Sequence, residues 1–197
     1  MKDIKTIEYY NKNAANFIAG TRDADISEIR NKFINLLSPG SLILDAGCGS
    51  GRDTLFFINS GFEVTSIDAS SEVCKLAEEY TKHPVICMSF DEIDSSDEFD
   101  GIWACASLLH IARESQTAIM EKLVHALKIG GILYASWKYG FEDHYVGERY
   151  YCDMNEQLIL KTIPDNLNLK VLDLWVSSDV RACSKSQYWI NMLLQKG

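Results

Sequence analysis

Apolar residues follow two spacings along the chain, and these spacings alternate. Recurrence every three to four residues predicts helices, whereas short apolar runs between turn residues are typical of buried strands. Helices are predicted over residues 3–19, 27–37, 53–60, 71–81, 114–128 and 155–162, the fourth capped by Ser71. Strands are predicted over residues 42–46, 62–67, 85–88, 99–105, 132–137, 169–176 and 187–194.

This order of elements predicts one α/β domain. Strands that alternate with helices of about ten residues favour a parallel sheet covered on both faces. Residues 177–186 are too few for a crossover helix, so the last two strands should form an antiparallel hairpin at one edge. We predict a Rossmann-like, doubly wound, seven-stranded sheet with six parallel strands and one antiparallel strand. In the predicted domain, 1–197, a capping segment (1–25) contains an N-terminal helix and precedes the core (26–197).

Composition restricts the possible partners. The net charge is −9 and no cluster of lysine and arginine stands out, which argues against nucleic acid as a partner. No apolar run approaches the roughly 20 residues that span a bilayer, and the first residues do not resemble a signal peptide. The six cysteines form no Cys-x-x-Cys pair, which argues against a zinc site and suits a reducing compartment. We therefore expect a cytoplasmic monomer or homodimer without a membrane or nucleic-acid partner.

A glycine-rich segment, residues 45–51, lies between the first predicted strand of the sheet and the helix that follows it. Glycines allow a tight turn and a close ligand, and the N–H groups of the helix start face that ligand. The spacing is Gly-x-Gly-x-Gly, whereas the dinucleotide fingerprint is Gly-x-Gly-x-x-Gly. Asp45 suits a ligand with an ammonium group, and Asp68, about twenty residues further on, suits ribose hydroxyls. An NAD-type oxidoreductase remains an alternative.

Residues 42–51 and 64–68 resemble motifs I and II of the class I S-adenosylmethionine (SAM)-dependent methyltransferases, and residues 100–110 resemble motif IV with its following loop. The resemblance covers residues 40–137 and implies SAM as cofactor and S-adenosylhomocysteine as product. The implied cofactor-binding residues are Tyr10, Asp45, Ala46, Gly47, Cys48, Gly49, Gly51, Asp53, Asp68, Ala69, Ser89, Phe90, Asp91, Cys105 and Ala106. A non-catalytic SAM-binding sensor or partner subunit would carry the same motifs, so this alternative stays open.

The methyl acceptor is expected to be a small molecule. The loop after the fourth strand lacks the Asn/Asp-Pro-Pro-aromatic motif of enzymes that methylate base amino groups, and it lacks the paired glutamates of protein arginine methyltransferases. His110 is a candidate general base, although methyl transfer mainly requires alignment of the reacting atoms.

A narrower resemblance, to the small tellurite-resistance methyltransferase-like group, covers residues 47–53, 106–110, 136–140, 175–181 and 189–191. It implies that Tyr139, Arg149 and Arg181 face the substrate, with Tyr139 as a second catalytic candidate. Paired hydrogen bonds from the two arginines suit an anionic substrate.

Overall fold

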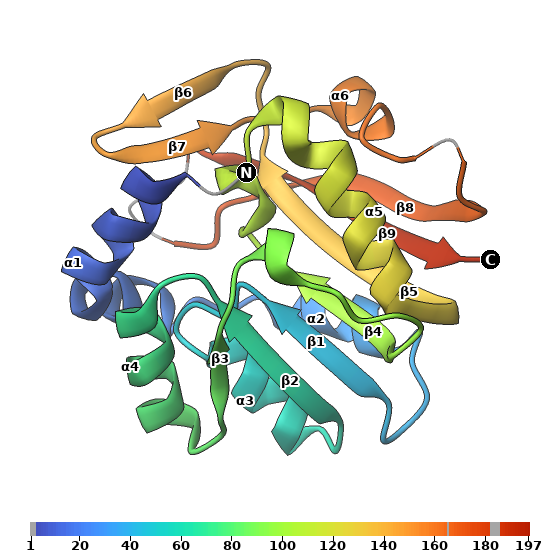
Figure 1. The fold of residues 1–197 in the computed structure, drawn as a ribbon, viewed down its shortest axis with the longest axis horizontal. Helices are drawn as coiled ribbons and strands as arrows, with labels where there is room; N and C mark the ends of the chain where they lie inside the picture. Colours follow the sequence, from blue (N-terminus) through green and yellow to red (C-terminus); the bar gives the residue numbers. More distant parts are fainter. Residues whose placement is uncertain (1–2, 165, 182–185) are drawn as a thin grey trace.

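The computed structural model describes residues 3–164, 166–181 and 186–197, and a central sheet organises it (Figure 1). The strands are β1 Leu42–Ala46, β2 Glu63–Asp68, β3 Val85–Cys87, β4 Phe99–Ala104, β5 Leu127–Lys138, β6 Asp143–Val146, β7 Arg149–Cys152, β8 Leu169–Ser178 and β9 Tyr188–Lys196. The α-helices are α1 Ile4–Thr21, α2 Ser27–Ile34, α3 Arg52–Asn59, α4 Ser71–Thr81, α5 Gln116–Ala126 and α6 Glu156–Leu160. Three short 3-10 helices are η1 Phe90–Glu92, η2 Leu108–His110 and η3 Arg113–Ser115.

The main sheet has seven strands in the order β3-β2-β1-β4-β5-β9-β8. β9 runs antiparallel to both of its neighbours, β5 and β8, while the other pairs are parallel. Six strands therefore point one way and one points the other, as the sequence predicted. The predicted antiparallel hairpin of the last two strands is confirmed as β8 and β9.

Successive residues of the central strands pack into two separate cores. Leu44 and Ile102 belong to the core that includes α5 and α6, whereas Ile43 and Trp103 belong to the core that includes α2 and α3. This division follows from the two-residue side-chain period of a strand. Helices thus cover both faces of the sheet, as expected for a doubly wound fold.

The boundary between α5 and β5 differs from the prediction. The glycine pair at 130–131 was expected to end the helix, but α5 ends at Ala126 and β5 begins at Leu127. Leu127 pairs with Phe99, and a shift of register between Phe99 and Gly101 follows. Gly130 has a φ of +82°, so the pair lies at an irregularity inside a long strand.

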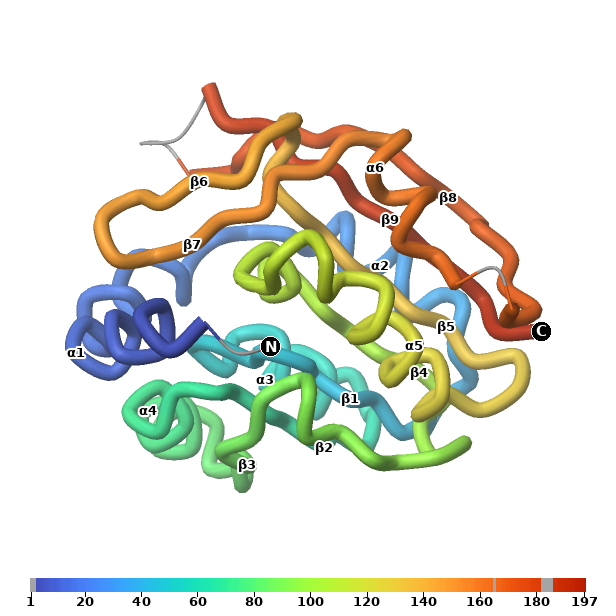
Figure 2. Tube along the Cα trace, turned by 45° about the horizontal axis from the view of Figure 1, so that its top comes forward, coloured from blue at the N-terminus to red at the C-terminus, as the bar shows by residue number. Residues whose placement is uncertain are grey.

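Residues 139–153, for which the sequence predicted neither helix nor strand, contain the hairpin of β6 and β7. The hairpin reaches back to the start of the chain, where Tyr150 N–H donates to Thr6 Oγ1 at 2.9 Å, and Figure 2 shows it beside α1. Two smaller differences concern helix ends. α2 ends at Ile34 instead of residue 37, and the N-cap of α4 is Ser70, whose Oγ accepts from Val73 N–H, instead of Ser71.

Candidate functional site

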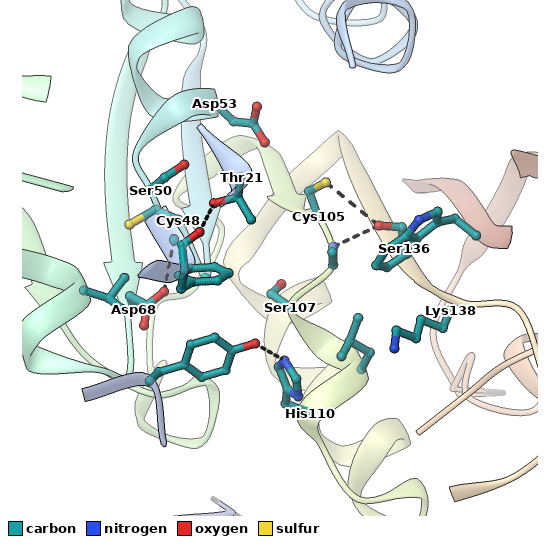
Figure 3. A pocket seen from close by; sticks show the side chains of 18 of the residues that line it. Thr21, Cys48, Ser50, Asp53, Asp68, Cys105, Ser107, His110, Ser136 and Lys138 are labelled. Carbon is teal, nitrogen blue, oxygen red and sulfur yellow. Dashed lines mark hydrogen bonds between the residues drawn. The ribbon is translucent and has the colours of Figure 1, made fainter. Parts of the chain in front are cut away.

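A cavity of about 490 Å³ opens at the carboxyl ends of β1, β2, β4 and β5 (Figure 3). Its walls also include residues of α1, η1, η2, β7 and the connection from β8 to β9. Open α/β sheets place ligands at this edge, because the loops that follow parallel strands meet there. The predicted site residues that line it are Tyr10, Gly47, Cys48, Gly49, Asp53, Asp68, Ala69, Ser89, Phe90, Asp91, Cys105, Ala106, His110, Arg149 and Arg181. Asp45, Ala46, Gly51 and Tyr139 were predicted as site residues and are not part of its lining.

The three glycines after β1 all have left-handed backbones but serve different contacts. Gly47, Gly49 and Gly51 have φ values of +84°, +54° and +74°. A Cβ on Gly47 would lie 2.4 Å from Cβ of Ser107, and one on Gly49 would touch the Phe17 ring at 3.4 Å. A Cβ on Gly51 would instead lie 2.6 Å from the Thr81 methyl group in α4. Gly47 and Gly49 therefore keep the cavity wall free of side chains, while Gly51 permits helix packing.

Asp68, at the end of β2, joins the loop after β1 to the loop after β2. One carboxylate oxygen accepts from Gly49 N–H at 3.1 Å, and the other accepts from Ser70 N–H at 2.9 Å (Figure 3). Burial raises the pKa of Asp68, and the N–H donors act in the opposite direction. Each carboxylate oxygen accepts more than one hydrogen bond, so the side chain can also accept from a ligand in the cavity.

Asp45 connects two elements of the fold and does not line the cavity. Its side chain is buried and accepts from Thr54 Oγ1 at 2.6 Å, which ties β1 to α3. Burial, followed by the charge of Asp53, raises the pKa of Asp45 to about 7. Asp53, which does line the cavity, is paired with Arg52 at 2.8 Å and accepts from Trp103 Nε1 at 3.0 Å. The expectation that Asp45 faces an ammonium group therefore does not fit its position.

His110 is held from both sides by hydrogen bonds. Its Nδ1 lies 2.7 Å from the Tyr150 carbonyl oxygen, and its Nε2 lies 2.9 Å from the Tyr10 hydroxyl (Figure 3). A carbonyl oxygen only accepts, so Nδ1 carries the proton and Nε2 accepts from Tyr10. Burial, together with the charges of Arg149 and Lys138, lowers the pKa of His110 to about 4. At neutral pH the imidazole is uncharged, and its only basic nitrogen is already bonded.

Side chains along β5 point alternately toward and away from the cavity, and this alternation decides which residues at its end line the cavity. Tyr134, Ser136 and Lys138, spaced two residues apart, all line the cavity. Tyr139 falls on the other phase, and its hydroxyl donates to Glu156 at 3.4 Å. Lys138 was missed by sequence reasoning, although the two-residue period would have favoured it once the face of β5 was known.

Two arginines that the sequence placed near the substrate have different surroundings. Arg181 forms two hydrogen bonds to Asp179, at 3.0 and 2.6 Å, and Asp179 also accepts from Trp189 Nε1. Arg149 lies over the rings of Tyr9 and Tyr151, at 4.8 and 5.4 Å from their centroids. Both arginines line the cavity, but only Arg181 has a carboxylate partner within the described chain.

Across residues 3–164, 166–181 and 186–197, no three His, Cys, Asp or Glu side chains are arranged to hold a metal ion. None of the helices in these ranges has the length and apolar character needed to cross a bilayer.

Comparisons with known proteins agree with this geometry. Residues 43–131 match a family model described as a methyltransferase domain. The backbone is similar to that of magnesium protoporphyrin IX methyltransferase from Synechocystis, crystallised with SAM, with a TM-score of 0.74 and 19% identity over 100% of this chain and 98% of that chain. Residues 43–131 are thus similar to a methyltransferase domain, and the chain has the fold of the SAM-dependent methyltransferases. SAM is the cofactor of this family.

Other relatives show how widely this family varies. The 2-methyl-6-phytyl-1,4-hydroquinone methyltransferase of Synechocystis is 31% identical over 112 residues, which are 53% of this chain and 34% of that protein. A TehB-like methyltransferase of Corynebacterium glutamicum has a TM-score of 0.69 at 18% identity, over 97% of this chain and 98% of that one. The [4+2]-cyclase SpnF has a TM-score of 0.77 at 16% identity, over 100% and 97%. The chain spans only about a third of the length of the hydroquinone methyltransferase.

Proposed function

We propose that this protein binds SAM in the cavity and catalyses transfer of its methyl group to a small-molecule acceptor. The observation that carries the proposal is the junction of the two loops after β1 and β2, where Asp68 binds Gly49 N–H beside a wall without side chains. That wall fits a ligand which approaches the backbone closely, because a Cβ on Gly47 would overlap Ser107. The acidic group beside it fits ribose hydroxyls.

The remaining cavity residues suit the other parts of this cofactor. We assign the adenine to the segment of Ser89, Phe90 and Asp91, which offers an aromatic ring and polar groups. We assign the methionine end to the glycine loop, with Tyr10 and Phe17 of α1 excluding water from it. When bound, the cofactor supplies an electrophilic methyl group on a sulfonium and leaves as S-adenosylhomocysteine after transfer.

The protein's own part in the reaction is mainly positioning. In-line displacement needs the nucleophile, methyl carbon and sulfur in one line, and a cavity with a fixed cofactor wall provides that alignment. His110 acts as a positioning residue, because its Nε2 already accepts from Tyr10 and its low pKa leaves little basicity. A site without a free general base suits acceptors whose nucleophile is already ionised or loses its proton to water.

Three alternatives have different consequences. SpnF shares the fold and is described as a cyclase, so the fold alone does not determine the reaction. A non-catalytic SAM-binding protein would bind the cofactor equally well but would not consume it. An NAD-type oxidoreductase would prefer NAD to SAM.

Calorimetric titration of the full chain with SAM, S-adenosylhomocysteine and NAD separates these possibilities. We expect both SAM compounds to bind and NAD to bind at least about tenfold more weakly. Incubation with methyl-labelled SAM and a broad panel of small acceptors should then give a labelled product. Absence of SAM binding contradicts the proposal, and binding without any transfer across the panel favours the non-catalytic alternative.

A further inference from the structure

Two cations in the wall of the cavity have no carboxylate partner. Of the lysines and arginines that line it, Arg52 pairs with Asp53 and Arg181 pairs with Asp179. Lys138 and Arg149 form no ion pair with any carboxylate of the residues that the structure describes. The chain as a whole has nine more acidic than basic residues, so unpaired cations inside a cavity are not explained by a shortage of carboxylates.

Both cations lie against the same aromatic ring. The Lys138 Nζ is 3.8 Å and the Arg149 Cζ is 5.4 Å from the ring centroid of Tyr151, which is itself buried. An aromatic face attracts a cation but does not neutralise its charge. In addition, Arg149 Nε is buried and has no hydrogen-bond partner within the described residues. A buried donor without a partner carries a free-energy cost that a ligand acceptor would remove.

Of the two carboxylates near this pair, Asp179 is bound to another cation and Asp153 does not line the cavity. Asp179 binds Arg181 through both oxygens and also accepts from Trp189. Asp153 lies close enough to raise the pKa of Lys138 but forms no ion pair with it, and its Oδ1 is buried without a hydrogen-bond partner among the described residues. Burial nevertheless lowers the pKa of Lys138 overall, and the charges of Arg149 and Arg181 act in the same direction. Among the charged residues that line this end of the cavity, Lys138, Arg149 and Arg181 outnumber Asp3 and Asp179.

We infer that the methyl acceptor carries an oxyanion group, which Lys138 and Arg149 bind beside Tyr151. The inference rests on the proposed function and adds the chemical class of its acceptor. Arginine binds carboxylate, phosphate or sulfonate oxygens in pairs, and a neighbouring ammonium adds a point charge. Figure 3 shows Lys138 at the end of the cavity away from Asp68, so the oxyanion and the ribose site are separate. The rings of Tyr10, Tyr151 and Trp189 in the wall suit a planar apolar body on the same molecule.

The test measures anion binding to the protein saturated with S-adenosylhomocysteine. Benzoate and phenyl phosphate are titrated by calorimetry, with benzamide as a neutral analogue of benzoate. We expect at least one of the two anions to bind, and benzamide to bind at least about tenfold more weakly than benzoate or not at all. Anion binding should also weaken as salt is added.

Two variants assign the binding to these residues. Lys138→Met and Arg149→Met should each weaken anion binding about tenfold or more, while the affinity for S-adenosylhomocysteine changes less than about threefold. Lys170→Met removes an exposed lysine of β8 that does not line the cavity, and it should leave both affinities unchanged. Melting temperatures of all variants show whether each is folded.

Each contrary result has its own meaning. If neither anion binds the loaded wild-type protein, or if benzamide binds as tightly as the anion that binds best, the acceptor inference is overturned and the proposed function stands. If Arg149→Met or Lys138→Met weakens S-adenosylhomocysteine as much as the anion, the pair binds the cofactor carboxylate and the inference is also overturned. If wild-type protein does not bind S-adenosylhomocysteine, the proposed function itself fails.

Discussion

The two ends of the cavity are built in different ways. At the cofactor end, the wall is mostly backbone, and its central contact joins Asp68 to Gly49, nineteen positions apart in the chain. At the acceptor end, the wall is made of side chains such as Tyr10, His110 and Lys138, which come from three distant segments. A backbone wall depends on φ angles and close approach, whereas a side-chain wall depends on which residues the fold brings together.

This difference explains why one fold serves many acceptors. The cofactor end is a local strand-turn-helix unit that tolerates little change, because a Cβ on Gly47 would overlap Ser107 and Gly49 has a left-handed backbone. The acceptor end includes the β6–β7 hairpin and the β8–β9 connection, where substitutions alter chemistry without disturbing the sheet. Sites on loops carried by a rigid scaffold commonly vary in this way.

The largest expected effect tests the backbone wall. Gly47→Ala adds a Cβ 2.4 Å from Cβ of Ser107 at a residue with φ of +84°. Overpacking and backbone strain together should cost about 3 kcal/mol of stability and reduce affinity for S-adenosylhomocysteine about 100-fold. Gly40→Ala is the matched control, because Gly40 has a φ of +78° but open space around it. The control should lose about 1 kcal/mol of stability and no affinity. Equal effects of the two substitutions would contradict a specific role for the wall.

The next prediction concerns the side chain that joins the two loops. Asp68→Asn replaces one carboxylate oxygen by an amide nitrogen. The nitrogen cannot accept a hydrogen bond, so the N–H group of either Gly49 or Ser70 loses its acceptor. We expect about 2 kcal/mol weaker binding of S-adenosylhomocysteine, about 30-fold, in calorimetric titration. Asp100→Asn alters a carboxylate that accepts from Leu42 N–H outside the cavity and should leave the affinity unchanged. A similar loss in both variants would mean that general destabilisation, and not the loop junction, sets the affinity.

The third prediction uses pH to test the acceptor end. His110 has a folded pKa of about 4 against a usual 6.5, so the unfolded chain takes up the proton first as pH falls. Its contribution to stability is complete above pH 6.5 and declines toward pH 4. Relative to His110→Gln, wild type should lose about 2 kcal/mol of unfolding free energy between pH 7.5 and 5, measured by urea denaturation.

The control for this pH effect is another histidine. His125→Gln alters an exposed histidine of α5 and should keep the pH profile of the wild type. If His110→Gln also keeps that profile, the imidazole is not held in the neutral, doubly bonded state.

The smallest expected effect is at Tyr139. Its hydroxyl donates to Glu156 outside the cavity, so Tyr139→Phe should change the affinities for S-adenosylhomocysteine and for benzoate less than about twofold. A tenfold loss of either affinity would show that Tyr139 contacts a ligand. It would contradict the distinction between Lys138, which lines the cavity, and Tyr139, which does not.

The sequence by itself determined the sheet and the turn that follows its first strand. The alternation of periods predicted seven strands with one antiparallel, and the glycine spacing with Asp68 predicted the turn between β1 and α3. These features are local, because neighbouring residues decide whether a segment is a strand, a helix or a tight turn. The boundary errors, such as the early start of β5, arose where pairing with β4 overrode a local stop signal at Gly130.

Only the tertiary structure decided which side chains face the cavity. The Asp45 side chain accepts a hydrogen bond from Thr54 instead of facing the cavity. Lys138 lines the cavity, whereas Tyr139 lies outside it and donates to Glu156. The basic nitrogen of His110 accepts from the Tyr10 hydroxyl. Each outcome depends on the packing of segments far apart in the chain. A one-residue change of phase in a strand turns a side chain to the other face, and no local pattern in β5 specifies which face meets the cavity.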